Sequence, residues 1–115
     1  MAASRTVVYT LKVVRDALTV TSVSEDLPGT LGYGVEEALT PNWWLDALHP
    51  EDRADVLASL PSLLGNGRWA VEYRFRHKDS SYRWLRDEAH LRWDAAGRPI
   101  EVIGKWTDVS EQRSR

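Results

Sequence analysis

His49-Pro50-Glu51-Asp52-Arg53 is the stretch from which the fold of this chain can be worked out, because it marks the entry to a helix. Proline at the first helical position loses no hydrogen bond, and carboxylates in the first turn face the positive end of the helix dipole. Leu57, Leu60 and Leu64 then form an apolar stripe. Pro61 would clash with the carbonyl group of Leu57, so we expect a kink or an early end near Leu60.

Three strands follow this helix, over residues 69–76, 82–93 and 102–107. Each alternates between two faces, as half-buried antiparallel strands do. The face expected to line the core carries Tyr73, Phe75, Leu85, Asp87, Ala89, Val102, Gly104 and Trp106. The opposite face carries charges of both signs, which suit cross-strand pairs, and is interrupted by Trp84 and Ile103.

The N-terminal half contains a hairpin and short helical turns. Residues 6–14 and 18–23 are rich in β-branched side chains and predict two paired strands. A brief helical segment contains Leu27 and Leu31, and a single turn over residues 35–39 ends at Thr40-Pro41. Two strands, short helices, one longer helix and three strands make an α+β domain.

Composition narrows the function classes. The 115 residues suit one domain, and the formal charge of −2 gives no overall attraction to nucleic acid. The absence of cysteine excludes disulfides, thiolate metal sites and cysteine nucleophiles. No apolar run approaches the ~18 residues of a membrane-spanning helix, so we expect a cytoplasmic domain without membrane contact, any anchor lying elsewhere in the parent protein.

Neither a catalytic nor a metal site is expected. His49, Glu51 and Asp52 lack the four-residue spacing of helical metal ligands, and a capping role explains all three. No nucleophile–base pair supports an enzyme.

Five segments in order resemble the motifs of PAS domains of the PAS fold-3 type, which belong to bacterial signalling proteins. Residues 49–53 match the family's "HPEDR" motif, residues 72–76 and 78–84 match "EYR-R-KDGSYRW", and residues 104–111 match "G-DIT-E". Leu31-Gly32-Tyr33 with Glu36-Glu37-Ala38-Leu39 is similar to "LGY-xx-EEL". The resemblance covers nearly the whole chain. The chain departs from the resemblance in two ways. Ser80 stands where the family often has glycine, and a turn requiring a positive φ would cost about 1 kcal/mol there. Pro28-Gly29 and Pro61 are poor helix residues where the family usually has helix formers.

The resemblance implies a five-stranded antiparallel sheet in the order 2-1-5-4-3, with the short helices and the longer one packed on one face. Residues 1–115 would form a single PAS domain with a core over about 6–110, and residues 111–115 would begin an exit helix. Such a helix, with so few residues, is expected to be truncated at Arg115 or to fray. The implied function is a non-catalytic sensory module that signals through its last strand, with Asp108 and Glu111 at the exit, to a downstream effector in the same chain. A histidine kinase of a two-component system or a diguanylate cyclase is the expected effector.

The resemblance also raises the question of cofactors, and we expect none. A covalent flavin adduct requires a cysteine, which the sequence lacks. PAS domains that bind haem typically take the histidine ligand of the iron from the longer helix, and residues 52–64 contain no histidine. A non-covalent flavin stays compatible with the sequence, because it requires no single ligand, although no residue points to one.

Two hypotheses remain for the concave face of the sheet. In one, Trp106 fills the cavity together with Tyr73 and Phe75 and leaves a plain core. In the other, Tyr73, Phe75, Leu85, Asp87 and Trp106 wall a pocket for a small apolar or aromatic ligand. A core-facing Asp87 needs a partner, either an arginine, a tryptophan N–H or a ligand donor. A cationic ligand would be helped by the surrounding rings.

The outer face offers the alternative function. Trp84 and Ile103 could seat a helix or a partner, so the domain could instead be a ligand-free interaction and dimerisation module. Similar PAS domains often dimerise through this face and a flanking helix. The chain has almost no N-terminal extension, and we therefore expect any homodimer to be weak.

Overall fold

The computed structural model describes residues 6–15 and 17–113. Its strands are β1 (Thr6–Val14), β2 (Ala17–Val23), β3 (Arg68–Arg76), β4 (Tyr82–Trp93) and β5 (Pro99–Asp108). Its helices are α1 (Leu27–Leu31), α2 (Val35–Ala38), α3 (Trp43–Ala47), α4 (Pro50–Ser59), α5 (Pro61–Asn66) and α6 (Ser110–Arg113). Residues 114 and 115 of the expected exit helix lie outside the described residues.

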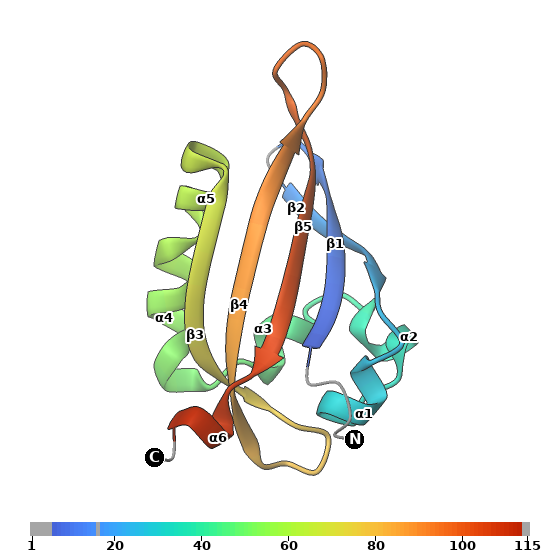
Figure 1. Ribbon diagram of the computed structural model, residues 1–115, viewed down its shortest axis with the longest axis vertical. Coiled ribbons are helices and arrows are strands. Elements are labelled where there is room, and N and C mark those ends of the chain that lie inside the picture. Colours follow the sequence, from blue (N-terminus) through green and yellow to red (C-terminus); the bar gives the residue numbers. More distant parts are fainter. Residues whose placement is uncertain (1–5, 16, 114–115) are drawn as a thin grey trace.

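The five strands form one sheet in the order β2-β1-β5-β4-β3, and all neighbours are antiparallel (Figure 1). This confirms the α+β class and the strand order implied by the resemblance. β5 therefore lies in the middle of the sheet, between β1 and β4, although it is the last strand in the sequence. A displacement of β5 therefore acts directly on both of its neighbours, β1 and β4.

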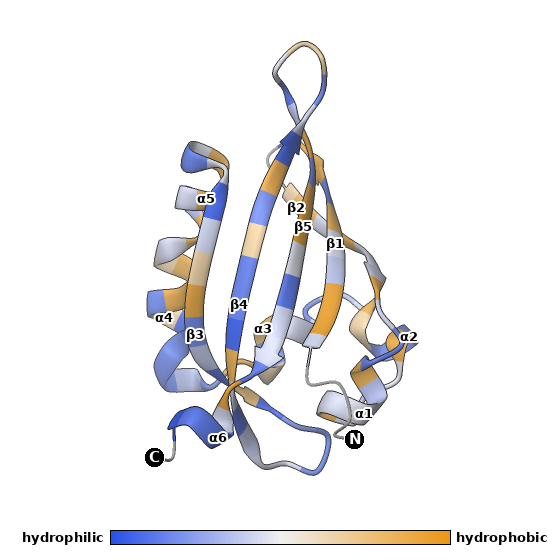
Figure 2. Cartoon of the chain, viewed as in Figure 1, coloured by the Kyte–Doolittle hydropathy of each residue, from blue (hydrophilic) through white to orange (hydrophobic). Residues whose placement is uncertain are grey.

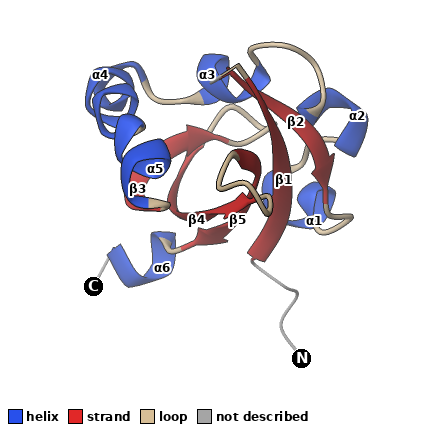
Figure 3. Ribbon diagram, turned by 90° about the horizontal axis from the view of Figure 1, so that it is seen from above, coloured by secondary structure: helices blue, strands red, loops and turns tan. Residues whose placement is uncertain are grey.

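The two faces of the sheet differ as the alternation predicts. Figure 2 shows hydrophobic and hydrophilic residues alternating along β4. The face predicted to line the core is buried; it includes Tyr73, Phe75, Leu85, Asp87, Ala89, Val102, Gly104 and Trp106. Helix α3 lies on one side of β4 and β5, and α6 lies on the other (Figure 3).

The helix entry at residue 49 forms as predicted. His49 is the N-cap of α4, and its Nδ1 atom accepts a hydrogen bond of 3.0 Å from the backbone N–H of Glu51. Pro50 occupies the first turn, where no hydrogen bond is lost. Helix α4 ends at Ser59 and α5 begins at Pro61, so the predicted break occurs at Leu60. The longer helix is thus two short helices in succession.

Two features were not predicted. Helix α3 begins after Asn42, whose φ is 66° and whose side chain makes no capping hydrogen bond. Asp52 does more than face a helix dipole. Its carboxylate accepts hydrogen bonds from the Arg74 backbone N–H at 2.8 Å and from the Arg74 guanidinium at 2.7 and 3.0 Å. This pairing ties α4 to β3 and lowers the pKa of Asp52.

The turn between β3 and β4 contains Ser80 in the left-handed region, at φ 76°. An L residue with a Cβ is strained there, whereas glycine is not. The substitution noted in the sequence therefore falls at a position that favours glycine.

Candidate functional site

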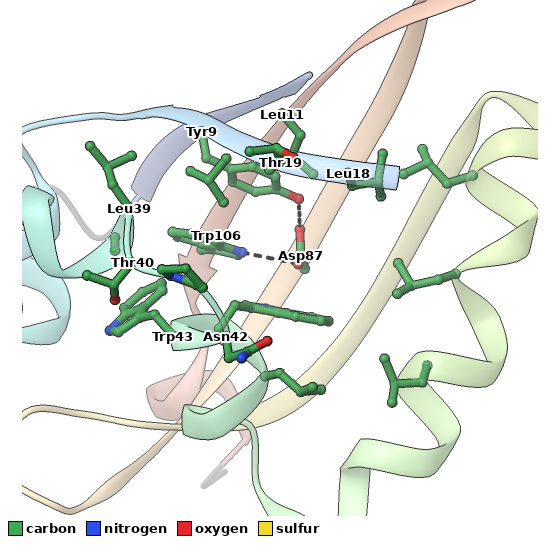
Figure 4. Close-up of a pocket in the computed structure, with 18 of the residues that line it drawn as sticks. Tyr9, Leu11, Leu18, Thr19, Leu39, Thr40, Asn42, Trp43, Asp87 and Trp106 are labelled. Atoms are coloured by element: carbon green, nitrogen blue, oxygen red, sulfur yellow. Dashed lines mark hydrogen bonds between the residues drawn. The ribbon is translucent and has the colours of Figure 1, made fainter. Parts of the chain in front are cut away.

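A pocket of about 540 Å³ lies between the inner face of the sheet and the helices that cover it (Figure 4). The sheet contributes residues of β1, β2, β3, β4 and β5, α4 and α5 contribute leucines, and the segment from α2 to α3 supplies the rest. The lining residues are Tyr9, Leu11, Leu18, Thr19, Val20, Ala38, Leu39, Thr40, Pro41, Asn42, Trp43, Trp44, Leu45, Leu57, Leu60, Leu63, Trp69, Asp87 and Trp106. The concave face is therefore not filled completely by its own side chains.

Asp87 is the centre of a hydrogen-bond network on the floor of this pocket. Its side chain is 1% exposed. Oδ2 accepts hydrogen bonds from the Tyr73 hydroxyl at 2.7 Å and from Trp106 Nε1 at 3.1 Å. Oδ1 accepts a short hydrogen bond from the Tyr9 hydroxyl (Figure 4). One carboxyl group on β4 therefore joins β1, β3 and β5.

Burial dominates the protonation of this network. It raises the pKa of Asp87 to about 7, because the desolvation of the carboxylate outweighs the three hydrogen bonds that favour it. Burial, with the nearby carboxylate, also holds the pKa values of Tyr9 and Tyr73 well above 10. Both tyrosines thus remain neutral donors around a carboxyl group that titrates close to neutral pH.

Trp106 and Tyr9 form an aromatic floor beside Asp87. Their rings are stacked, with centroids 4.4 Å apart and an interplanar angle of 20°. Tyr9 lies opposite Gly104 in the β1–β5 ladder, and its ring covers the position that a Cβ atom on residue 104 would occupy. Glycine at this position is what lets the Tyr9 ring lie flat and reach Asp87.

The predicted pocket residues have two different positions. Asp87 and Trp106 line the pocket, whereas Tyr73, Phe75 and Leu85 are buried in the core and are not among its lining residues. Tyr73 supports the site from behind, because its hydroxyl donates to Asp87 and accepts a hydrogen bond of 2.9 Å from Trp44 Nε1. Of the partners considered for Asp87 in the sequence, a tryptophan N–H is present, together with two tyrosine hydroxyls.

The sequence patterns did not indicate several of the residues that line the pocket. Four of the six tryptophans line the pocket, and three of these, Trp43, Trp44 and Trp69, were not assigned to it. Tyr9 lies in the strand predicted over residues 6–14 but was not connected to Asp87. The signal that could have found Tyr9 is Gly104, since a glycine in a central strand often marks a close approach by another group.

The outer face is partly covered by α6. The guanidinium of Arg113 stacks on the Trp84 ring at 3.7 Å, and Arg74 lies over the same ring at 5.5 Å. Ile103 lies in a shallower hollow of about 910 Å³ near Val8 and Lys105. The two predicted interaction residues therefore have different surroundings, because Trp84 packs against the chain's own C-terminal helix.

The exit from the sheet is held by short contacts. The carboxylate of Asp108 accepts a hydrogen bond of 2.9 Å from the backbone N–H of Ser110, at the start of α6. Ser110 in turn accepts a hydrogen bond of 2.8 Å from the Trp84 backbone N–H. Glu111 is exposed on α6. The last strand and the last helix are thus joined through Asp108.

Within residues 6–15 and 17–113, no group of three or more histidine, aspartate or glutamate side chains could hold a metal ion. In the same part of the chain, no helix has the length and apolar character needed to cross a membrane.

Comparisons with known proteins point to one family. A family model described as the PAS fold matches residues 20–105. A two-component sensor of Pseudomonas aeruginosa, PprA, is 34% identical over 110 residues, which are 92% of this chain and 11% of that protein. The chain thus spans only a small part of the length of this relative.

Solved structures agree on the fold. The N-terminal domain of a diguanylate cyclase with a PAS/PAC sensor, from Marinobacter aquaeolei, has a TM-score of 0.79 and 23% identity, covering 92% of this chain and 98% of that one. A sensory box histidine kinase/response regulator from Burkholderia thailandensis has a TM-score of 0.72 and 27% identity, covering 96% and 82%.

Proposed function

Since this chain belongs to the PAS family, whose members serve as sensory domains of signalling proteins, we propose that it senses a small ligand in its inner pocket. The pocket of about 540 Å³ is the observation that carries the proposal. Its volume falls within the range of ~300–1,000 Å³ found for small-molecule sites, and its lining is largely apolar and aromatic. The ligand is a small molecule with an apolar or aromatic body, and the domain itself is non-catalytic, has no resident cofactor and acts in the cytoplasm.

The pocket is connected to the end of the domain by one strand. Trp106 lines the pocket, and Asp108 caps α6 two residues later on β5. A ligand that moves the Trp106 ring also moves the strand that carries Asp108, because a β-strand transmits displacement along its backbone. The helix α6 then shifts against Trp84, and an effector joined to it receives the signal.

A second candidate function is a protein-interaction module without a ligand. The favouring observation is the hollow on the outer face, where Ile103 and the 47%-exposed Val8 present apolar surface. In this reading the partner is a second copy of the domain, bound weakly.

The two candidates are separated by one purification. The protein is denatured, and the released small molecules are quantified by mass spectrometry. A stoichiometric compound supports ligand sensing, and its binding to the refolded domain should shift the amide resonances of α6. Absence of any compound, together with a concentration-dependent dimer that Ile103→Glu abolishes and that a charge reversal on the exposed face of α4, Asp55→Lys, does not, supports the interaction module.

A further inference from the structure

The charge of the pocket is unbalanced. Among the described residues that line it, Asp87 is the only one with an ionisable acid or base other than Tyr9. Within the described part of the chain, Asp87 makes no ion pair. Its hydrogen bonds come from Tyr9, Tyr73 and Trp106, which are neutral donors. A buried carboxylate is normally paired with a cation, and none of the described residues supplies one to Asp87.

Only a proton or a positive charge in the pocket can neutralise this group. Burial raises the pKa of Asp87 to about 7, so that near neutral pH the proton is held only partly. Tyr9 and Tyr73 face it from β1 and β3 as neutral hydroxyls. Glu88, which follows it in β4, lies on the opposite face and adds negative charge. Among the described residues that line the pocket, none carries a positive charge that would compete with a bound cation for the carboxylate.

The rest of the lining suits a cation that carries an apolar body. Trp43, Trp44, Trp69 and Trp106 all line the pocket, and the faces of indole rings attract positive charge. The carboxylate has about four acceptor positions, of which the three internal donors occupy three. One acceptor position is left for a donor that enters with the ligand.

We propose that the ligand of this pocket is a monocation, an ammonium group on an apolar or aromatic body, neutralised by Asp87 and enclosed by the tryptophan rings. This inference rests on the proposed ligand-sensing function and names the class of its ligand.

A matched pair of probes tests it. 2-Phenylethylammonium and 2-phenylethanol are nearly equal in size, and both donate hydrogen bonds, so their difference is the charge. Binding is measured with the full chain by tryptophan fluorescence and by amide chemical shifts. At about pH 8, where Asp87 is ionised, we expect the ammonium probe to bind at least about tenfold more tightly than the alcohol.

Two variants locate the effect. Asp87→Asn should reduce the preference for the ammonium probe to about twofold or less, while binding of the alcohol persists. Glu88→Gln removes the same charge one residue away, on the outer face, and should leave the preference unchanged. In the unsubstituted chain the preference should also fall between about pH 8 and pH 5, as Asp87 takes up its proton.

Three results would overturn the inference: equal affinity for the two probes, an ammonium preference that survives in Asp87→Asn, or binding of neither probe at millimolar concentration. Equal affinity would leave the ligand-sensing proposal intact, since a neutral molecule then occupies the pocket. The sensing proposal itself is decided by the extraction of a bound compound, which does not depend on either probe.

Discussion

The two faces of this sheet use acidic residues in opposite ways. On the outer face, Glu72 pairs with Arg86 at 3.0 Å and Glu101 pairs with Arg92 at 2.6 Å, all with partly exposed side chains. On the inner face, Asp87 is buried among aromatic rings and meets only neutral donors. On β4, Arg86 thus belongs to a partly exposed ion pair, whereas the adjacent Asp87 is a buried carboxyl group whose hydrogen-bond donors are neutral.

This difference indicates which face of the sheet contributes most to the free energy of unfolding. Exposed pairs gain little, because water screens the charges and the side chains lose freedom when they pair. A buried carboxyl group changes the free energy of unfolding with every change of its protonation state. Substitutions on the inner face should therefore have large effects, and matched substitutions on the outer face should have small ones.

The largest effect is expected for Trp106→Ala. The side chain is 4% exposed, stacks on Tyr9 and donates to Asp87, so its removal leaves a cavity and takes away one of the three donors to the carboxyl group. We expect the free energy of unfolding to fall by about 3–5 kcal/mol in urea titrations. Trp93→Ala, at a site 51% exposed, is the control and should cost markedly less. Equal losses would mean that the inner face is not the stabilising one.

The second largest effect is expected for pH, which should change the free energy of unfolding by up to about 4 kcal/mol. The pKa of Asp87 is raised from 3.8 to about 7 on folding, so the folded state holds the proton more tightly. Its contribution is complete below about pH 4 and is lost as the pH rises through 7. The difference in unfolding free energy between the unsubstituted chain and Asp87→Asn should decline across this window. A flat difference would contradict the burial of the carboxyl group.

Gly104→Ala should be the next most damaging change. The added Cβ would overlap the Tyr9 ring, which would have to leave its stack on Trp106. Overpacking of this kind costs about 1–3 kcal/mol, and thermal unfolding would report it. Gly97→Ala makes the same change at a hairpin turn with open space around it. Because φ of Gly97 is 80°, alanine would be strained there, and this variant is a poorer control. Gly29→Ala, with no atom near the added Cβ, is the cleaner control.

The β3–β4 turn belongs to neither face and should respond in the opposite direction. Ser80→Gly removes the strain of a positive φ at 76° and should raise the free energy of unfolding by about 1 kcal/mol. Ser81→Gly, one residue along, is the control and should give no gain. A destabilised Ser80→Gly variant would show that the serine has a compensating contact.

The smallest effect is expected on the outer face. Arg86→Ala breaks its pair with Glu72, but the Arg86 side chain is 43% exposed, and the cost should be below about 1 kcal/mol. The small loss should shrink further when the salt concentration is raised. A loss as large as that of Trp106→Ala would remove the distinction between the two faces.

Much of this contrast could be predicted from the sequence. Period-two alternation placed Asp87 and Trp106 on the inner face, and the proline positions predicted the helix entry and the break near Leu60. The strain at Ser80 came from the comparison with the family's motif. The strand order came from the family resemblance. Local patterns suffice for these features because each depends on a few adjacent residues.

The rest depends on contacts between distant residues. Tyr9 reaches Asp87 from 78 residues away, and Asp52 binds Arg74 across 22 residues. Such partners are set by the register of β1 on β5 and by the docking of α4, which no local pattern encodes. Helix α3, which carries Trp43 and Trp44, has only five residues, and Asn42 before it makes no capping hydrogen bond.

The stacking of Arg113 on Trp84 holds helix α6 in one rotation about its own axis relative to the sheet. A helix turns by about 100° per residue, so any helical segment fused in register after α6 points in a direction counted from this anchor. Inserting one residue swings the fused partner to another side, and inserting seven returns it nearly to its first bearing. In chimeric proteins built on this domain, the length of the linker would thus set the direction in which the fused partner points.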